Sequence, residues 1–528
     1  MTIPLTGSHL IAGAPSRAGS DTFTATDPRT RAPLEPVYAN ATLDEIEQAV
    51  QAARAAFAET RLYPAARLAA FLERAAGEIE ALGDQLLETA DRETGLGIPR
   101  LTGERARTAG QLRKFAGLLR EGSYVEAIVD SAQPDRQPAP RPSIRRMLIP
   151  IGPVAVFSAS NFPLAFSVAG GDTASAFAAG CPVIVKAHPS HPATSELTAA
   201  ALARAVAAEG FPAGFFSLLH GARVDMAQAL VTHPGIAAVG FTGSLRAGRA
   251  IFNAAAARPV PVPVYAEMGS VNPLVILPGA LAERGAAVAS GLADSVTLGS
   301  GQFCTNPGLV FVIESAAAQA FIAQFVDEMR QRQPGVLLNA NVEQGLAQAV
   351  AGTLARPGVE ALTGGAPIEA DGFCYPHTVL LTTSDAFRAD AALQAEHFGP
   401  VTLIVRCDSF DDLLATVECV EGNLTASVHA ADSEMADAGR LYSALREKVG
   451  RLIWNGYPTG VEVVYAMQHG GPYPATTAPH STSVGLTAIK RFLRPVAFQN
   501  FPDALLPDAL KDGNPLGIWR IVDEQWTR

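Results

Sequence analysis

The stretch from Gly299 to Gly308 holds the side chain with the clearest capacity for covalent chemistry. A single cysteine, Cys304, stands there on a glycine-rich turn between an apolar helical segment and the strand-like run Leu309–Ile313. Glycines let a backbone and a substrate approach closely, and a thiol displayed on such a turn can attack a carbonyl carbon. The alternative is a buried structural cysteine, which most free cysteines are. This stretch alone leaves both interpretations open.

Composition and charge exclude several classes of function. The chain has 528 residues, of which 48% are hydrophobic and 17% charged, as in globular proteins of more than one domain. Its net charge of −11 leaves no basic surplus to displace counterions from a phosphate backbone, so we expect no nucleic-acid partner. The N-terminus lacks the basic and apolar regions of a signal peptide, and charge, Gly or Pro interrupts the longer apolar stretches, so no membrane partner is expected.

The five cysteines are widely spaced and form no C-x-x-C pair. This spacing suggests neither a zinc site nor a disulfide framework, so we expect no metal. Free thiols fit a reducing compartment, and a cytoplasmic location is expected.

Short apolar runs alternate with alanine-rich helical segments in the middle of the chain. The runs are Val154–Ser158, Pro182–Ala187, Phe215–Leu219, Ile236–Phe241 and Val262–Ala266. This alternation is typical of a doubly wound parallel sheet with helical crossovers. A second α/β pattern begins near Asn272, with strands expected at 272–277 and 309–313 and helices at 282–298 and 316–332.

The flanking regions differ from this core. Thr42 and Glu45 have the spacing of a capping box, which predicts a helix start, and two further amphipathic helices are expected at Ala65–Ala90 and Gly103–Leu119, with Arg120 just beyond the end. The segment Ser131–Pro142 is rich in proline and polar residues and is expected to be an exposed arm. The proline-containing tail 495–528 is expected to wrap over a neighbouring domain or subunit.

Polar residues and glycines follow four of the apolar runs directly, where ligands bind in open parallel sheets. They are Ser160, Asn161 and Phe162 after the first run, Lys186 and His188 at the end of the second, Gly243, Ser244 and Gly248 after the fourth, and Glu267 and Met268 after the fifth. We therefore expect these strand ends to meet at one crevice. The loop from Gly243 to Gly248 leads into a helix whose N-terminus can accept a phosphate, although it is not the usual G-x-G-x-x-G dinucleotide fingerprint.

Together these motifs resemble the aldehyde dehydrogenase superfamily over essentially the whole chain. The resemblance rests on the order of Asn161-Phe162-Pro163, Lys186, Phe241-Thr242-Gly243-Ser244, Glu267-Met268-Gly269, Gly301-Gln302-Phe303-Cys304 and Glu396-x-Phe398-Gly399-Pro400. It implies an α/β fold with two doubly wound parallel-sheet domains and a small β oligomerisation arm. The cofactor-binding domain would comprise 1–130 and 147–270, completed by part of 470–494. The catalytic domain would be 271–469, and 131–146 with 495–528 would form the arm and tail.

The resemblance also implies roles for individual residues. Cys304 would attack an aldehyde carbon, and the amide of Asn161, with the backbone N–H of Cys304, would hold the resulting oxyanion. Glu267 would act as general base on the water that hydrolyses the thioester. A dinucleotide would be bound by Ser160, Lys186, His188, Gly243, Ser244, Gly248, Met268, Glu396 and Phe398.

One departure from the family pattern bears on cofactor choice. Members that prefer NAD often carry an acidic residue three positions after the lysine, where this chain has Pro189. Without that carboxylate a 2′-phosphate is not repelled, so NADP is the expected cofactor and NAD the alternative.

Within the superfamily the resemblance is closest to 2-oxoglutarate semialdehyde (2,5-dioxovalerate) dehydrogenases and NADP-dependent fatty aldehyde dehydrogenases. The semialdehyde implies a small-molecule substrate whose carboxylate would favour a cation in the pocket wall. Arg107 and Arg113 are candidates for that cation, and Phe162 is a further candidate for substrate contact. The resemblance also implies a homodimer or homotetramer.

Three alternatives stay open at this stage. A cysteine hydrolase or esterase could pair Cys304 with His397, His469 or His480, because histidine is the usual base for such a thiol. An acylating dehydrogenase would pass the acyl group to coenzyme A. A binding protein could keep the fold without activity, although the presence of Cys304, Glu267 and Asn161 together speaks against this.

Overall fold

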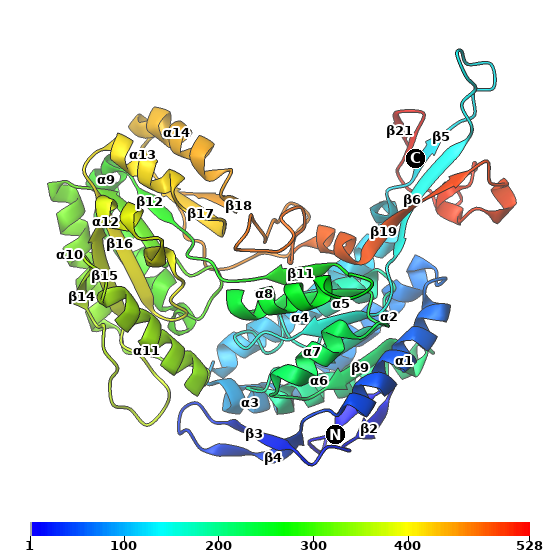
Figure 1. Cartoon of the computed structure of the whole chain (residues 1–528), viewed down its shortest axis with the longest axis horizontal. Helices are drawn as coiled ribbons and strands as arrows, with labels where there is room; N and C mark the ends of the chain where they lie inside the picture. The colour runs from blue at the N-terminus through cyan, green and yellow to red at the C-terminus, as the bar shows by residue number, and fades with distance from the viewer. Residues whose placement is uncertain (1–2) are drawn as a thin grey trace.

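The computed structural model describes residues 3–528 (Figure 1). Within this range the strands form two seven-stranded sheets, one five-stranded sheet and one two-stranded sheet. Figure 1 shows the two large sheets with their helices side by side, and an arm that projects away from them and carries the C-terminus. None of the helices between residues 3 and 528 is long and apolar enough to cross a membrane.

The first sheet has the order β11-β10-β7-β8-β9-β1-β2, and its five strands from β7 to β11 run parallel. Its strands are β1 (His9–Ile11), β2 (Ala14–Ser16), β7 (Val154–Phe157), β8 (Val183–Lys186), β9 (Phe216–Leu219), β10 (Ala238–Thr242) and β11 (Val264–Glu267). All five predicted apolar runs are therefore strands of one sheet, in the parallel arrangement that the alternation predicted.

This sheet is buried on both faces because alternate side chains enter two different cores. On β7, Val154 and Val156 pack into one hydrophobic cluster, whereas Ala155 and Phe157 pack into another. A continuous apolar strand with this two-sided burial is typical of a parallel sheet with helices on both faces.

Helices cover both faces of the first sheet. They are α1 (Leu43–Thr60), α2 (Ala65–Glu80), α3 (Gly83–Thr94), α4 (Ile98–Glu121), α5 (Gly171–Ala178), α6 (Pro192–Ala208), α7 (Val224–Thr232) and α8 (Leu245–Ala256). The predicted capping box is confirmed: Thr42 Oγ1 accepts a hydrogen bond from the Glu45 amide at 3.2 Å, and a Glu45 oxygen accepts one from the Thr42 amide at 2.9 Å.

Two details of the helical prediction were wrong. The single helix expected over 65–90 is two helices, α2 and α3, because the chain turns at Gly83 with a φ of +58° that interrupts regular helix. Arg120 lies inside α4, which begins earlier and ends later than predicted, with Gly122 as a left-handed cap at a φ of +84°.

The second sheet has the order β14-β15-β16-β13-β12-β17-β18 and is parallel apart from its edge strand β14. Its strands are β12 (Leu274–Ile276), β13 (Leu309–Ile313), β14 (Glu360–Thr363), β15 (Thr378–Thr383), β16 (Val401–Cys407), β17 (Asn423–His429) and β18 (Val449–Trp454). The helices around it are α9 (Pro278–Thr297), α10 (Ala316–Gln331), α11 (Ala340–Leu354), α12 (Ser384–Ala389), α13 (Phe410–Glu418) and α14 (Met435–Leu445). It too is buried on both faces, since Val310 and Phe311 enter different cores.

The arm is built from segments far apart in the sequence. β5 (Ile128–Asp130), β6 (Ile144–Pro150), β19 (Leu493–Gln499), β20 (Arg520–Val522) and β21 (Gln525–Thr527) pair in the order β19-β6-β5-β20-β21. The hairpin between β5 and β6 is exposed over residues 131–140, as the proline-rich composition predicted, and it points away from both sheets in Figure 1. A short hairpin of β3 (Thr22–Thr26) and β4 (Pro33–Ala39) completes the strands.

Candidate active site

The polar residues that follow the strands of the first sheet meet at a cavity of about 550 Å³, a size typical of ligand sites. Residues of the second sheet's connections complete its wall, including Cys304 and Glu396. Of the residues predicted from the sequence, the cavity is lined by Ser160, Asn161, Phe162, His188, Gly243, Ser244, Glu267, Met268, Cys304, Glu396 and Phe398. The expectation of one shared crevice is thus met by residues from separate parts of the sequence.

Four predicted residues do not line this cavity. Gly248 lies directly behind it, because a Cβ there would lie 2.6 Å from the Cγ of Met268. Lys186 is the last residue of β8, and Arg107 packs over the ring of Phe166, which lines the cavity. Arg113 lies elsewhere: its guanidinium forms a bidentate ion pair with Glu80 at 2.6 Å on the surface.

A run of left-handed backbone presents Cys304. Gly299, Ser300 and Gly301 have φ angles of 55°, 57° and 67°, and a Cβ on Gly301 would collide with the backbone of Gly399. The side-chain amide of Asn272 fixes the turn from below by donating to the carbonyl oxygens of Cys304 and Asn306, both at 2.8 Å. The glycines predicted to permit close approach are therefore required by the backbone itself.

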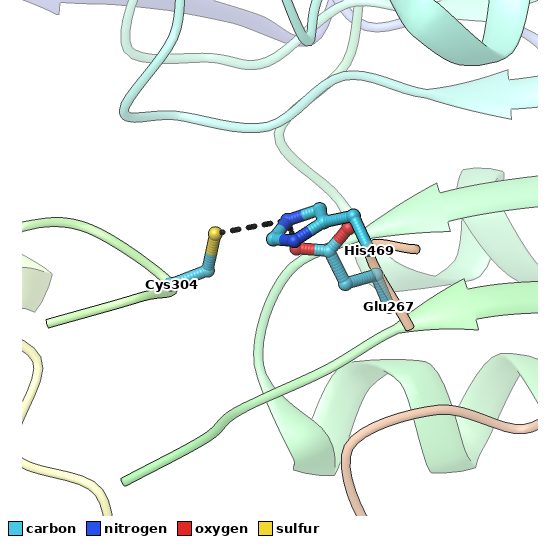
Figure 2. Close-up of side chains that lie close together, drawn as sticks. All are labelled: Glu267, Cys304 and His469. Carbon is cyan, nitrogen blue, oxygen red and sulfur yellow. Dashed lines mark hydrogen bonds and ion pairs between the residues drawn. The ribbon is translucent and has the colours of Figure 1, made fainter. Parts of the chain in front are cut away.

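A histidine lies between the thiol and the carboxylate (Figure 2). Nε2 of His469 is 3.5 Å from Sγ of Cys304 and 3.0 Å from Oε1 of Glu267. The side chains of His469 and Glu267 are 0% and 1% exposed. Glu267 is the last residue of β11, whereas His469 comes from the segment that returns from the second sheet to the first.

Burial sets the resting ionisation of this group. Burial, followed by the nearby Glu267 carboxylate, raises the pKa of the Cys304 thiol well above its ordinary value. Burial would also raise the pKa of Glu267, but His469 and a hydrogen bond from Ser483 outweigh it and hold that pKa below its ordinary value. The resting site thus contains a neutral thiol beside a carboxylate.

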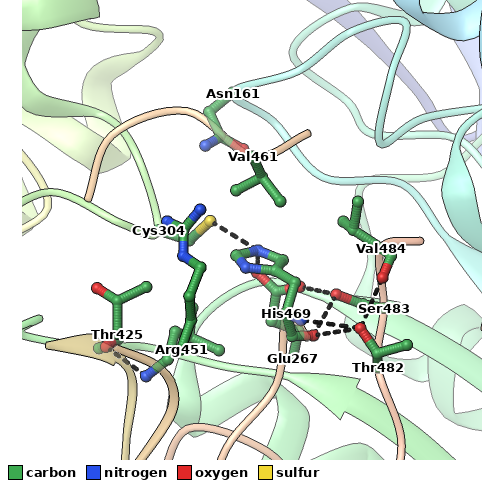
Figure 3. Close-up of polar contacts among 12 residues, drawn as sticks. Asn161, Glu267, Cys304, Thr425, Arg451, Val461, His469, Thr482, Ser483 and Val484 are labelled. Atoms are coloured by element: carbon green, nitrogen blue, oxygen red, sulfur yellow. Dashed lines mark hydrogen bonds and ion pairs between the residues drawn. The ribbon is translucent and has the colours of Figure 1, made fainter. Parts of the chain in front are cut away.

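The return segment also supports the carboxylate from behind (Figure 3). The hydroxyl of Ser483 contacts Oε2 of Glu267 and lies 3.0 Å from the carbonyl oxygen of His469. Thr482 Oγ1 accepts the backbone N–H of His469 at 2.8 Å. These contacts fix the orientations of Glu267 and His469 together, because one short segment carries the partners of both.

Asn161 lies on the side of the thiol away from Glu267, as Figure 3 shows. Its side-chain amide donates to the carbonyl oxygen of Gln302 at 2.9 Å, which leaves its second N–H for another acceptor. Its backbone carbonyl accepts a hydrogen bond from Arg100 at 2.7 Å. The guanidinium of Arg100 also stacks between the rings of Phe162 and Phe303, at 5.1 and 4.9 Å, so one cation connects the loop of Asn161 with the loop of Cys304.

The other end of the cavity has features that fit a dinucleotide. Ser244 caps the N-terminus of α8, and Gly243, Ser244 and Ala247 line the cavity at this point. Helix N-termini accept phosphate. Ser158 lines the cavity with a buried hydroxyl that has no hydrogen-bond partner within residues 3–528. Burial lowers the pKa of Lys186, at the end of β8, to about 8.

Glu396 lies where the two large sheets' loops meet. The amide of Ser270 donates to Oε1 of Glu396 at 3.4 Å, and a Cβ on Gly269 would collide with its Oε2. Burial raises the pKa of Glu396 to about 7, and the charge of Glu267 acts in the same direction. The glycine after Met268 is thus the residue that lets this carboxylate reach the cavity.

Two arginines lie close to the thiol. The guanidinium of Arg107 donates to the carbonyl of Val461, and that of Arg451, on β18, donates to the carbonyls of Gly460 and Pro458 at 3.0 and 2.6 Å. Burial lowers the pKa of both guanidinium groups. The Glu104 carboxylate opposes this effect at Arg107, and an ionised Cys304 would oppose it at both arginines. Nε of Arg451 is buried without a partner among the described residues.

Part of this site was not predicted from the sequence. His469 was expected only as the base of an alternative hydrolase, beside His397 and His480; His397 hydrogen-bonds Thr353 at 2.9 Å, and His480 is exposed. Arg100, Arg451 and Ser483 were not among the candidates. The one local signal was the Gly470-Gly471 pair after His469, which marks a close backbone approach.

Comparisons with known proteins agree with this geometry. The profile described as the Aldehyde dehydrogenase family matches residues 16–474. An alpha-ketoglutaric semialdehyde dehydrogenase 2 of Azospirillum brasilense is 51% identical over 526 residues, which cover 98% of this chain and 99% of that protein. An alpha-ketoglutaric semialdehyde dehydrogenase of Acinetobacter baylyi is 45% identical, with 98% of each chain covered.

Solved structures share the fold. A betaine aldehyde dehydrogenase point mutant from Staphylococcus aureus, crystallised with NAD+, superposes with a TM-score of 0.81 at 20% identity, covering 94% of this chain and 98% of that chain. The profile match and the two relatives, which align over nearly the full length, show that this chain belongs to the aldehyde dehydrogenase family.

Proposed function

We propose that this aldehyde dehydrogenase oxidises alpha-ketoglutaric semialdehyde to 2-oxoglutarate with a nicotinamide dinucleotide. The half-buried thiol of Cys304, with the buried imidazole of His469 and carboxylate of Glu267 at the wall of a dinucleotide-sized cavity, carries the reaction class. The substrate is supported by the names of the two relatives that are 51% and 45% identical.

The thiol is the proposed nucleophile, and His469 prepares it. Nε2 of His469 lies 3.5 Å from Sγ and 3.0 Å from Oε1 of Glu267, so the His469–Glu267 pair can take the thiol proton, which the imidazole and the carboxylate then share. The thiolate then adds to the aldehyde carbon to give a thiohemiacetal. The free N–H of Asn161 donates to the oxyanion, a contact that contributes about 2.7–4 kcal/mol in other enzymes.

The cofactor end of the cavity supports a nicotinamide dinucleotide as the second reactant. When bound, this cofactor accepts the hydride that leaves the thiohemiacetal carbon, so that the adduct on sulfur becomes a thioester. Gly243, Ser244 and the start of α8 would hold its pyrophosphate, and Glu396 would accept hydrogen bonds from ribose hydroxyls. Ser160, His188, Met268 and Phe398 line the same cavity and would contact the remaining parts of the cofactor.

Glu267 is the proposed general base for release of the acid. It lines the cavity, and its carboxylate is ionised in the resting site, so it can take a proton from water that attacks the thioester. Ser483 and His469 keep its two oxygens in a fixed orientation.

A preference for NADP is part of the proposal. Pro189 and Ser190 line the cavity just beyond Lys186, and neither carries a charge that would repel a 2′-phosphate. The Lys186 amine is a cation at neutral pH with a pKa of about 8, and a phosphate beside it would favour its charged form.

Arg107 and Arg451 are the proposed partners of the substrate carboxylate. Each guanidinium has five N–H donors and uses only some of them in hydrogen bonds to backbone carbonyls. Both groups lie near the thiol that would hold the aldehyde end of the substrate. Arg113 is replaced in this role by Arg451, because the ion pair with Glu80 holds Arg113 at the surface. Phe162 and Phe166 would pack against the aliphatic part of the substrate.

The division into domains and the assembly are also proposals. The first sheet would bind the cofactor and the second would carry the nucleophile, in the boundaries expected from the sequence. The exposed hairpin at 131–140 and the open edge of β19 favour a homodimer or homotetramer built through the arm, because open strand edges tend to be paired or covered.

A steady-state panel tests the proposal. The purified chain is assayed for cofactor reduction with alpha-ketoglutaric semialdehyde and with medium-chain and long-chain alkanals, each with NADP+ and NAD+. We expect the highest kcat/KM for the semialdehyde with NADP+. A higher kcat/KM for long alkanals would favour a fatty aldehyde dehydrogenase, and ester cleavage with no cofactor reduction would favour a hydrolase. Dependence on added coenzyme A would identify an acylating enzyme.

A further inference from the structure

Cys304, His469 and Glu267 have the composition of a zinc site as well as of a catalytic group. We propose that Zn²⁺ binds reversibly to Sγ of Cys304, Nε2 of His469 and Oε1 of Glu267 and thereby blocks the enzyme. The metal site rests on the geometry of this cluster, and only its inhibitory effect rests on the proposed role of Cys304. The spacing of cysteines along the chain gave no sign of it, since the three ligands are separated by 37 and 165 residues.

The distances between the three ligand atoms suit a tetrahedral ion. Zinc bonds of about 2.3 Å to sulfur and 2.0–2.2 Å to nitrogen and oxygen imply an S···N separation of about 3.6 Å and an N···O separation of about 3.4 Å. The structure has 3.5 Å between Sγ and Nε2 and 3.0 Å between Nε2 and Oε1, and all three ligand atoms lie within 4.8 Å of one another. Small side-chain rotations would bring all three into bonding positions.

The charges of the cluster also favour a divalent ion. Zinc binding releases the Cys304 thiol proton to solvent, because a metal ligand must be deprotonated. The resulting thiolate and the carboxylate, with a neutral imidazole, carry two negative charges, which cancel those of Zn²⁺. This cancellation matters because His469 and Glu267 are fully buried, where an uncompensated ion is costly. Sulfur and imidazole ligands select Zn²⁺ over Mg²⁺ and Ca²⁺, which prefer all-oxygen sites.

The surroundings leave room for a fourth ligand and fix the first three. Cys304 and Glu267 line the cavity, so a water from it can complete the coordination. Oε2 of Glu267 contacts the hydroxyl of Ser483, and the backbone N–H of His469 is tied to Thr482 at 2.8 Å. Ligands held this way lose little freedom when an ion binds. A thiolate bound to zinc cannot add to an aldehyde, so zinc and substrate exclude one another.

Direct binding and site-specific labelling test the proposal. Chelator-treated chain is titrated with Zn²⁺ in competition with a chromophoric chelator, and Cys304 labelling by iodoacetamide is followed by peptide mass. We expect one tight zinc ion per chain, slowed labelling of Cys304, loss of aldehyde oxidation and full recovery with EDTA. Mg²⁺ at the same concentration should change neither labelling nor activity. Co²⁺ should give a thiolate-to-metal absorption band in the near ultraviolet.

Variants separate this site from other thiols. Cys304→Ala should abolish the tight zinc ion and the cobalt band, and His469→Gln should weaken zinc binding at least about 100-fold, since loss of even an indirect supporting partner costs 10–100-fold. Cys419→Ala, which removes an exposed cysteine, should leave both unchanged. Binding of NADP+ by each variant shows that it is folded. Tight zinc binding that survives Cys304→Ala or His469→Gln would overturn the proposal. Zinc binding by a chain that shows no aldehyde oxidation even without zinc would support the metal site and contradict the proposed function.

Discussion

Replacing His469 with glutamine tests whether this histidine activates the thiol. The glutamine side chain could still donate a hydrogen bond to Glu267, but it could not accept the thiol proton at neutral pH. Burial and the Glu267 charge keep Cys304 protonated at rest, so loss of the proton acceptor should leave fewer reactive thiolates. The substitution therefore removes the proton transfer and keeps much of the packing.

The structure limits the size of the effect. Proton transfer by a positioned side chain contributes about 10²–10⁴ to a rate. Because an oxygen of Glu267 also lies within 4.8 Å of Sγ, this carboxylate can replace part of the function, which favours the lower end. We expect kcat/KM to fall about 100-fold, equivalent to about 2.7 kcal/mol of transition-state stabilisation.

Two assays measure this effect separately from binding. The rate of Cys304 alkylation by iodoacetamide at pH 7 reports thiolate formation, and the kcat/KM for the semialdehyde reports turnover. Both should fall, while the Kd for NADP+ stays the same. His397→Gln is the matched control, because this histidine is buried against Thr353 and does not line the cavity. Alkylation and turnover at the wild-type rates in His469→Gln would refute the reasoning.

Four further outcomes are expected. Glu267→Gln should slow thioester hydrolysis more than acylation, so that intact mass spectrometry detects an acyl-enzyme after one turnover. No detectable acyl-enzyme together with an unchanged kcat would show that Glu267 is not the base. The affinity for NADP+ should be full below pH 8 and fall by up to about tenfold per pH unit above it, because the Lys186 amine, with its pKa of about 8, loses its proton. Calorimetric titrations should show this slope in the wild type and no slope in Lys186→Met. Equal slopes in both proteins would contradict the assignment. Arg451→Leu should raise KM for the semialdehyde about tenfold or more, given the roughly 1.5–3 kcal/mol of a charged hydrogen bond, and leave KM for hexanal unchanged, whereas equal increases would indicate general damage to the pocket. Gly269→Ala should displace Glu396, because the new methyl group collides with its carboxylate. The KM for NADP+ should therefore rise more than the KM for aldehyde. A KM for NADP+ equal to that of the wild type would contradict this role of Gly269.

The sheet and the positions of most cavity residues could be predicted because they depend on local patterns. Continuous apolar runs such as Val154–Ser158 can be buried only in a doubly covered sheet, and the polar residues after them must then lie at its carboxyl edge. The turn at Gly83 was missed because alanine and leucine on both sides favour helix.

The contribution of His469 could not be predicted in the same way. Its distance from Cys304 and Glu267 depends on how the chain returns from the second sheet to the first, and no local pattern encodes that path. Arg451 was missed because an arginine on an edge strand is usually a solvated surface residue. Arg113 was a candidate because it lies on the same predicted helix as Arg107, but it pairs with Glu80 of another helix, a contact that no local pattern predicts.

The return segment after residue 454 has a consequence for how activity arises during synthesis. Cys304 and Glu267 leave the ribosome long before His469 and Ser483, yet the latter two hold the carboxylate in place. A nascent or truncated chain that stops before 469 would contain every strand of both large sheets, but it would lack the core residues Leu486, Ile489 and Phe492 and the partners of the Glu267 carboxylate. Catalytic competence would therefore emerge only in the last stage of translation, and a fragment carrying residues 455–528, added in trans, would have to restore it.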